Sequence, residues 1–504
     1  EKPSYQHSIT PVLQYSFSGS FMDFEVIIGF ETHVELKTQT KLFCSCAVDY
    51  EAPPNSRICP VCTGQPGALP VLNKKAVQFT VKAGLALGCL INRHSRFARK
   101  NYFYPDLPKS YQISQYERPF CQDGLLEITG DDGKLYPVGI KRVHLEEDAG
   151  KLVHSSSSFE SSTHSFVDYN RSSVPLLEIV TDHERNPLRS VQEARIYLEK
   201  LRQILRYIEI SDCSMEKGQL RCDVNISLRP SGAKAFGHRS EIKNMASFKF
   251  IMDALEYEIR RQSEILRSGG EMAQETRLYD EAKRVTLPMR SKEDAPDYRY
   301  FPDPDLVEIE LDEGFIDRIR KKMPELPDQK IHRLMEEFDV PREEVLILTK
   351  EKAVSDYFTT CALSCADRKK LSRWIIKDLF KLLNKASLPM EQCPVRPDHF
   401  SALVNLIAKG EVTEKMARTI LEEMFEKGVS PESVIESKGL KPIHDSFALE
   451  KMVDDVLAEN PEALAKIKAG NKKPVDFLIG QVMKKTRGKA DPAALTKLIQ
   501  KKLR

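Results

Sequence analysis

The sequence lacks any apolar run that approaches the ~20 residues needed to cross a membrane, and its mean hydropathy is −0.40. It also lacks an excess of charge of one sign, since 76 Lys and Arg stand against 74 Asp and Glu. Residues 1–21 contain neither the apolar segment of a secretory signal nor the arginines of a transit peptide. We therefore expect a cytoplasmic protein without a membrane partner, in which residues 1–21 are a tail.

Cysteine is too sparse for a disulfide scaffold, with 11 in 504 residues and an odd total. Neither G-x-x-x-x-G-K-[ST] nor G-x-G-x-x-G occurs, which excludes a P-loop and a dinucleotide-binding fingerprint. A Ser-rich amidase signature and an evident Cys–His–Glu glutaminase arrangement are also absent. Any nucleotide site in this chain must therefore be of another type.

The first 300 residues combine strand-like and helical patterns. Residues 24–36 and 219–228 alternate between apolar and polar positions, which is typical of strands with one buried face. The helical periodicity falls on residues 75–87, 190–207 and 247–267. We expect an α+β domain over residues 22–315, built on an antiparallel sheet.

Helical periodicity replaces the strand signals from residue 316 onward, for example in residues 367–384 and 397–408. We expect a helical domain over residues 316–430 and a small all-helical tail domain over residues 431–504. The last 39 residues hold twelve Lys or Arg and two acidic residues, a net charge of +10. This stretch could bind the backbone of RNA, or it could be a solvated helical face. The residues proposed for RNA binding are Lys484, Lys485, Arg487 and Lys489.

Four cysteines form two close pairs, which makes them the strongest local signal in the chain. Cys44 and Cys46 are followed after twelve residues by Cys59 and Cys62. This spacing indicates a tetrahedral structural zinc site, a knuckle over residues 44–62. The alternative is four ordinary free cysteines. A catalytic zinc is disfavoured, because four thiolates leave no open coordination position.

Ionisable side chains gather on several predicted strands. Glu31, His33 and Glu35 share one face of the first strand, and the segment 144–148 holds a histidine and three carboxylates. On its own such a set is typical of a solvated strand face. If the strands are neighbours, the carboxylates could bind Mg²⁺ and the cations could bind phosphates. A histidine ligand suits Mn²⁺ better than Mg²⁺, so His33 could instead position a substrate.

Residues 99–109 alternate cations, aromatic residues and prolines after a helix. Such a loop could stack on a base and contact phosphates. Tyr102, Phe103 and Tyr104 could equally pack into the core.

Seven long motifs, in order, resemble the GatB family, the B subunits of aspartyl/glutamyl-tRNA amidotransferases. The resemblance extends from Met22 to the C-terminus, where GQVMKKTRGKADP (480–492) is similar to the family's tRNA-binding domain. The motifs are IGFETHVEL (28–36), ARKNYFYPDLPKSYQISQY (98–116), VHLEEDAGK (143–151), DYNRSSVPLLEIV (168–180), RCDVNISLRP (221–230), EIKNMASF (241–248) and DYRYFPDPDL (297–306).

The resemblance implies a cradle domain followed by a helical domain and a tail domain. It also implies that ATP phosphorylates the side-chain carboxylate of Glu-tRNA(Gln) or Asp-tRNA(Asn), and that ammonia then displaces the phosphate. The implied partners are the amidase of the same complex (its A subunit), which supplies the ammonia, and a small C subunit. The implied cofactors are ATP, Mg²⁺ or Mn²⁺, and an accessory structural Zn²⁺.

The resemblance also assigns roles to residues of this chain. The catalytic residues would be Glu31, His33, Lys100, Glu146, Glu147, Arg221 and Asp223. The nucleotide would contact Lys100, Asn101, Tyr102, Arg221, Asn225, Glu241 and Lys243. Magnesium would be bound by Glu31, His33, Glu147 and Glu216, and zinc by Cys44, Cys46, Cys59 and Cys62.

Two other interpretations of the sequence remain open. The chain could be a non-catalytic, zinc-containing scaffold that binds tRNA, which would not hydrolyse ATP in response to tRNA. It could also resemble the archaeal paralogue, which carries a synthetase-like insert before its helical region. The space between the motif that ends at Leu306 and the helical pattern that begins near Pro324 leaves no room for that insert.

Overall fold

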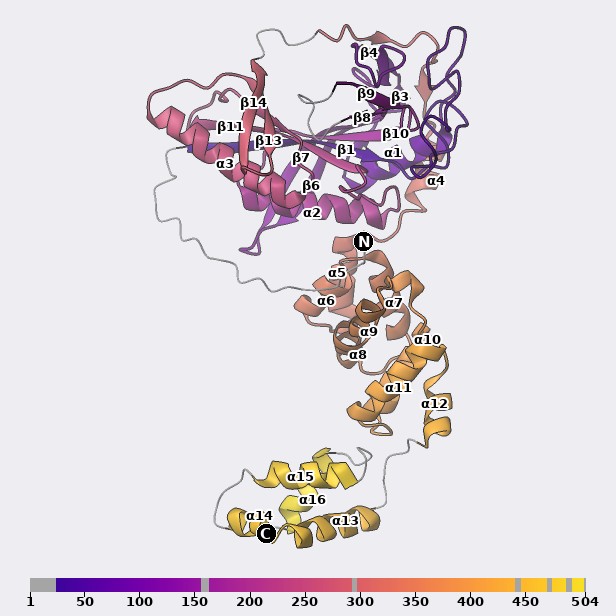
Figure 1. The fold of residues 1–504 in the computed structure, drawn as a ribbon, viewed down its shortest axis with the longest axis vertical. Coiled ribbons are helices and arrows are strands. Elements are labelled where there is room, and N and C mark those ends of the chain that lie inside the picture. The colour runs from indigo at the N-terminus through magenta and orange to yellow at the C-terminus, as the bar shows by residue number, and fades with distance from the viewer. Residues whose placement is uncertain are drawn as a thin grey trace. The chain divides into compact units, whose positions relative to one another are not determined.

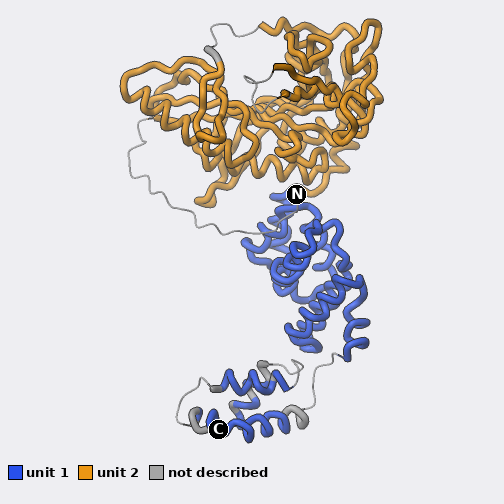
Figure 2. Tube along the Cα trace, viewed as in Figure 1, with its two compact units in different colours: residues 1–14, 327–504 blue, residues 15–326 orange. Residues whose placement is uncertain are grey.

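The computed structural model describes residues 24–155, 163–291, 297–439, 446–468, 474–485 and 492–502. The tail expected at residues 1–21 lies outside these ranges. The chain divides into two compact units, one ending at Leu326 and the other beginning at Pro327 (Figure 2). Each unit is described by itself.

The first unit is built on a nine-stranded sheet of order β14-β13-β12-β11-β1-β10-β7-β6-β2. Neighbouring strands are antiparallel except β12 and β13, which confirms the prediction of an α+β fold on a largely antiparallel sheet. The strands are β1 Phe24–Glu35, β2 Leu90–Ile91, β6 Cys121–Thr129, β7 Leu135–Glu147, β10 Pro175–Thr181, β11 Leu220–Pro230, β12 Ser240–Lys243, β13 Glu275–Asp280 and β14 Val285–Ser291.

Helices cover one face of this sheet because its strands alternate in polarity. Ile28, Phe30 and Val34 of β1 are buried beneath them, whereas Glu31 and His33 belong to the other face. Figure 1 shows two of the helices, α2 and α3, running along the same side of the sheet. The helices are α1 Lys74–Ala86, α2 Val191–Tyr207 and α3 Phe248–Arg267, each begun by an Asn or Ser side chain that accepts backbone N–H groups. They match the three predicted helices to within one residue at each end.

Short strands and loops lie on the open, polar side of the sheet. The loop with the four cysteines connects β1 to α1. The small sheets are formed by β4 Ala98–Asn101, β5 Tyr111–Ser114 and β15 Phe301–Pro302, by β8 Lys151–His154 and β9 Ser165–Asp168, and by β3 His94–Ser95 and β16 Ile309–Glu310. The unit ends with α4 Glu313–Arg320.

The second unit is helical throughout its described part. One apolar core joins α5 to α12, and its members run from Leu334 to Val434. The described tail helices enclose a separate core that includes Val456, Leu478 and Ile499. The helices are α5 Pro327–Phe338, α6 Arg342–Leu348, α7 Lys352–Ala362, α8 Arg368–Trp374, a π-helix Ile375–Leu379, α9 Phe380–Ala386, a 3₁₀ turn Met390–Gln392, α10 Pro397–Ala408, α11 Glu414–Lys427, α12 Pro431–Lys438, α13 Ser446–Glu459, α14 Pro461–Lys468, α15 Pro474–Lys485 and α16 Pro492–Lys502.

Candidate functional site

Strand register brings several of the predicted ionisable residues onto one face of the sheet. His33 of β1 lies opposite Glu178 of β10 and opposite Arg221 of β11. Glu178 in turn lies opposite His144 of β7. Because residues directly opposite each other in a sheet point to the same face, polar side chains from four or more strands meet there. β11 is paired directly with β1, whereas β10 lies between β1 and β7 in the sheet.

His33, Glu146 and Glu178 converge closely enough to bind one metal ion. Each offers a ligand atom, and these atoms all lie within 4.8 Å of one another. Nε2 of His33 is 3.8 Å from Glu146 Oε1 and 3.7 Å from Glu178 Oε2. One imidazole and two carboxylates are a donor set that fits Mn²⁺ well and Mg²⁺ adequately.

A second histidine stabilises the two carboxylates of this cluster. Nε2 of His144 lies 3.0 Å from Glu178 and 3.6 Å from Glu146, and its ring is buried. Although burial opposes the effect, attraction to Glu178 raises the pKa of His144. Against the same opposition from burial, His144 lowers the pKa of both carboxyl groups. The pair is therefore held ionised, as a metal ligand requires.

Cations border the cluster and could meet phosphate groups. Lys100 of β4 stands over the ring of Tyr298, with 4.8 Å between Nζ and the ring centre. Burial would lower the pKa of Lys100, but the Glu146 carboxylate raises it, so this lysine stays charged. Arg221 pairs with Asp148 at 2.7 Å. Lys243 pairs with Asp223 and, at 3.0 Å, with Glu241.

A cavity of about 520 Å³ adjoins the polar face, which is a volume typical of small-ligand sites. Gly29, Glu31 and Asn225 line it, together with Arg142 and Thr181. Asn225 donates a 3.0 Å hydrogen bond to Glu31. Burial, followed by the nearby carboxylates of Glu178 and Glu241, raises the pKa of Glu31. A protonated or metal-neutralised Glu31 would suit this cavity better than a free carboxylate.

Glu147 points away from the cluster of His33, Glu146 and Glu178, because successive residues of a strand face opposite sides. Its carboxylate pairs with Lys109 and accepts hydrogen bonds of 2.8 Å from the Ile113 amide and the Ser173 hydroxyl. Three protein donors are thus directed at the two carboxylate oxygens. The described contacts of Glu147 therefore hold β5 and the loop before it against β7.

Three other predicted residues are not members of the cluster, although Tyr102 borders it, with its ring centre 5.8 Å from Nζ of Lys100. Glu216 is exposed in the turn before β11. Asn101 donates to the carbonyl oxygen of Arg299 at 2.8 Å and so fastens the segment before β15. Tyr102 contacts Tyr298 edge to face, with 6.0 Å between ring centres.

Glu178 is a member of the cluster that was not predicted from the sequence. It lies within the motif 168–180 as the single charge in the apolar strand β10. A lone carboxylate in an otherwise apolar strand was the available signal.

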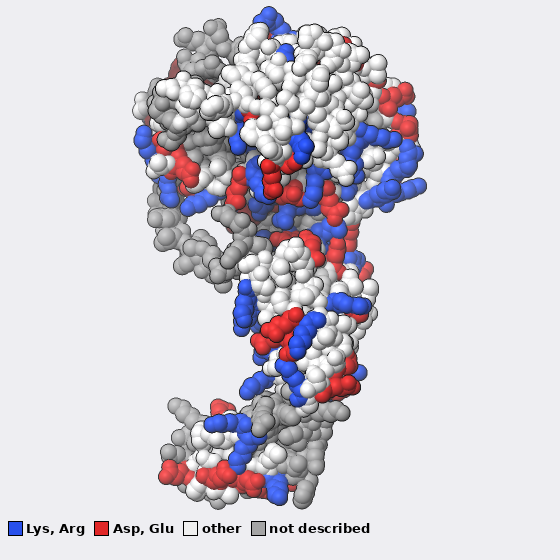
Figure 3. Space-filling view, turned by 45° about the vertical axis from the view of Figure 1, so that its right-hand side comes forward, with Lys and Arg blue, Asp and Glu red and all other residues white. Residues whose placement is uncertain are grey.

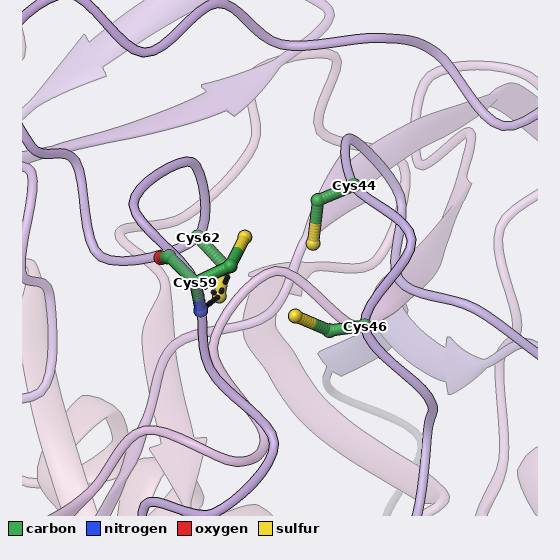
Figure 4. Close-up of side chains that lie close together, drawn as sticks. All are labelled: Cys44, Cys46, Cys59 and Cys62. Atoms are coloured by element: carbon green, nitrogen blue, oxygen red, sulfur yellow. Dashed lines mark hydrogen bonds between the residues drawn. The ribbon is translucent and has the colours of Figure 1, made fainter.

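The four cysteines come together in one loop region, as their spacing predicted. Their sulfur atoms can all bind one ion, and Figure 4 shows them directed toward a common centre. The Cys59 amide donates to Sγ of Cys62 at 3.2 Å. A hydrogen bond from the Cys44 thiol lowers the pKa of Cys62 to about 5, although burial opposes it. Four sulfur donors around one point fit a closed tetrahedral metal site.

The cysteine loop also contacts the polar face. Tyr50 donates a 2.6 Å hydrogen bond to Glu35 at the end of β1. Lys109 lies against Gly64, where a Cβ atom would come within 2.3 Å of Lys109 Cγ. Gly64 also has a φ of +68°, a conformation that favours glycine. The folded loop therefore helps to position two ionisable groups beside the site.

The basic end of the tail is described only in part. Lys484 and Lys485 are exposed at the end of α15, and Lys485 pairs with Glu459 at 2.6 Å. Arg487 and Lys489 lie outside the described residues. On the face shown in Figure 3, basic and acidic side chains are intermixed over the described surface. No helix among the described residues is long and apolar enough to cross a membrane.

Comparison with known proteins identifies relatives over nearly the whole chain. The family model of the GatB/GatE catalytic domain matches residues 26–317, and that of the GatB domain matches residues 356–503. A protein of Carboxydothermus hydrogenoformans is 49% identical over 481 residues, covering 95% of this chain and 99% of the relative. One of Persephonella marina is 49% identical over 485 residues, covering 96% and 100%. Each of the two is named as the B subunit of an aspartyl/glutamyl-tRNA(Asn/Gln) amidotransferase.

Proposed function

Because the chain belongs to the GatB family of amidotransferase B subunits, we propose that it converts Glu-tRNA(Gln) or Asp-tRNA(Asn) into the amidated form. ATP phosphorylates the side-chain carboxylate, and ammonia then attacks the acyl phosphate. The observation that carries this proposal is the polar sheet face, where carboxylates, histidines and cations from neighbouring strands meet. A non-catalytic scaffold would have no need for so many buried charges.

The phosphorylation step fits the charges on this face. An unactivated carboxylate reacts poorly with ammonia, because its leaving group would be oxide. Phosphoryl transfer is catalysed mainly by positioning and by stabilising the charge on the transferring group. We assign that stabilisation to Lys100 and Arg221, with Lys243 beyond them on β12. The cavity beside Glu31 and Asn225 is the proposed place for the nucleotide.

The proposed metals occupy two different sites. Magnesium or manganese would be held by His33, Glu146 and Glu178, where it would neutralise phosphate charge. His144 would keep the two carboxylates oriented and ionised. Zinc would be held by the four cysteines and would fold the loop that contacts Glu35 and Lys109. This division agrees with the donor chemistry of each cluster.

The proposed partners follow from what the chain has and lacks. Its sequence carries no recognisable amidase signature, so the ammonia would come from the amidase, the A subunit of the complex. A small C subunit would be the third member of the complex. Glu-tRNA(Gln) and Asp-tRNA(Asn) would be held by the tail domain through Lys484, Lys485, Arg487 and Lys489. Their positive charge suits contact with phosphates rather than with base edges.

The test is ATP hydrolysis by the purified complex, measured with and without Glu-tRNA(Gln). We expect tRNA to stimulate hydrolysis, and Lys100→Met to reduce that stimulated rate by at least ~100-fold. The matched control is Lys200→Met, on α2 away from the polar face. Hydrolysis that does not respond to tRNA would favour a scaffold. A Lys100→Met variant that keeps the stimulated rate would show that Lys100 does not take part in phosphoryl transfer.

A further inference from the structure

Lys41 is completely buried in the loop that carries the four cysteines. Its Nζ donates to the Tyr169 carbonyl oxygen at 3.1 Å and lies 3.5 Å from Sγ of Cys62. The backbone amide of Lys41 donates to the Cys46 carbonyl at 2.9 Å, so the lysine is fixed within the loop. Among the described residues, no Asp or Glu carboxylate pairs with it.

A buried ammonium group without an anionic partner is strongly unfavourable. Two other lysines with buried side chains in the described part of the chain have carboxylate partners: Lys109 pairs with Glu147, and Lys330 pairs with Asp356. The anion that balances Lys41 must therefore be of a different kind. The sulfur atoms of the cysteine cluster are the groups within reach.

We propose that Lys41 is the counter-ion of a metal tetrathiolate formed by Cys44, Cys46, Cys59 and Cys62, and that its charge is needed for tight metal binding. The inference rests on the zinc site of the proposed function. Four thiolates around a divalent ion carry a net charge of −2, and the ammonium reduces this to −1. The N–H group directed at Cys62 supplies a hydrogen bond to a ligand sulfur, a contact that orients metal ligands.

The choice of Cys62 as the contact has a physical reason. It is the buried member of the set, whereas Cys44, Cys46 and Cys59 are partly exposed. Water can therefore solvate the negative charge on three of the sulfurs but has little access to the fourth. Lys41 faces the sulfur that most needs a cation. The Tyr169 carbonyl holds the ammonium in place. Three residues further along the same loop, the Ser172 hydroxyl donates a hydrogen bond to the Cys62 carbonyl oxygen.

The test compares zinc affinity across variants of the full chain, by competition with a chromophoric chelator under reducing conditions. Lys41→Met removes both the charge and the N–H donor. Lys41→Gln removes the charge but keeps an N–H donor for the Tyr169 carbonyl. We expect both to bind zinc ~10–100-fold more weakly than wild type. Lys37→Met is the matched control, because Lys37 is exposed and pairs with Asp212; it should bind zinc normally.

The outcomes separate this inference from the zinc proposal. Wild-type chain that binds no zinc would overturn the zinc site itself. Wild-type zinc binding with unchanged affinity in both Lys41 variants would overturn only the counter-ion role. Each variant is also refolded across a range of zinc concentrations. A weakened site should recover its circular dichroism spectrum at high zinc, whereas variants that stay unfolded at every concentration would show that Lys41 acts in folding alone.

Discussion

At the scale of single residues, Glu35 gives the protein a stability that depends on pH. Burial, and then the Asp148 carboxylate, raise the pKa of Glu35 to about 7. Between about pH 4.5 and 7 the unfolded chain therefore releases a proton that the folded chain keeps, so the free energy of unfolding falls as pH rises. Glu35→Gln cannot ionise. We expect its stability relative to wild type to increase by about 1–3 kcal/mol from pH 5 to pH 8.

Urea unfolding at the two pH values measures this change. Glu127→Gln, an exposed substitution on β6, is the control. A stability difference between Glu35→Gln and wild type that is the same at both pH values would show that Glu35 is not the source of the pH dependence.

The buried pair of Glu147 and Lys109 makes a second residue-scale prediction. Glu147→Gln leaves the Lys109 ammonium buried without its counter-charge, so we expect a loss of about 3 kcal/mol in the free energy of unfolding. The double variant Lys109→Met/Glu147→Gln removes both charges and should recover most of that loss. Urea denaturation measures both variants. A double variant no more stable than the single one would show that the pair is not the cause.

The cluster of His33, Glu146 and Glu178 shows how far single residues could be assigned from sequence. His33 and Glu146 were both predicted to be catalytic, but the magnesium ligand was assigned to Glu147 rather than to Glu146. Adjacent strand residues face opposite sides, so that choice depends on which side is polar. Which side is polar depends on the partners of β7, and Glu178 joins the cluster through the pairing of β10 with both β1 and β7. Such pairings are contacts between distant segments that local patterns do not specify.

At the scale of elements, local periodicity predicted most of what the structure shows. The predicted strand at 24–36 is β1 Phe24–Glu35, and the helices at 190–207 and 397–408 recur almost unchanged. The predicted helix at 367–384 contains a π-helix at Ile375–Leu379, which the apolar periodicity did not reveal. The order of strands in the sheet could not be predicted from local sequence patterns, since it depends on pairing between segments that are distant along the chain.

The cysteine loop is the element whose stability should depend most on a bound ion. It lacks a regular helix or strand, and its contacts to Glu35 and Lys109 require the loop to be folded. We expect removal of zinc by a chelator to lower the melting temperature of the first unit by about 5 °C or more. Hydrogen exchange should then increase over residues 44–64 and remain unchanged in α10. Unchanged exchange in the loop would show that the fold does not need the metal.

At the scale of the whole molecule, the tail should contribute salt-dependent RNA affinity. A chain that ends after Gly439 keeps α12, whose Val434 packs into the helical core, and removes only the tail helices. If the tail engages about five phosphates, its loss should flatten the dependence of log K on log salt concentration by about 3.5 to 4.5. Filter binding of tRNA between low and moderate salt measures this slope. A truncated chain with the full slope would place the RNA contacts elsewhere.

The central claim is that the polar sheet face of this chain activates the carboxylate and forms the amide. The most direct measurement supplies ammonium chloride instead of glutamine to the complex, with Glu-tRNA(Gln), ATP and Mg²⁺, and identifies the amino acid released by mild hydrolysis. We predict glutamine from the wild type and from Glu127→Gln, and a rate at least ~100-fold lower from a folded Glu146→Gln variant. Glutamate alone from the wild type, or undiminished glutamine formation by Glu146→Gln, would contradict the claim.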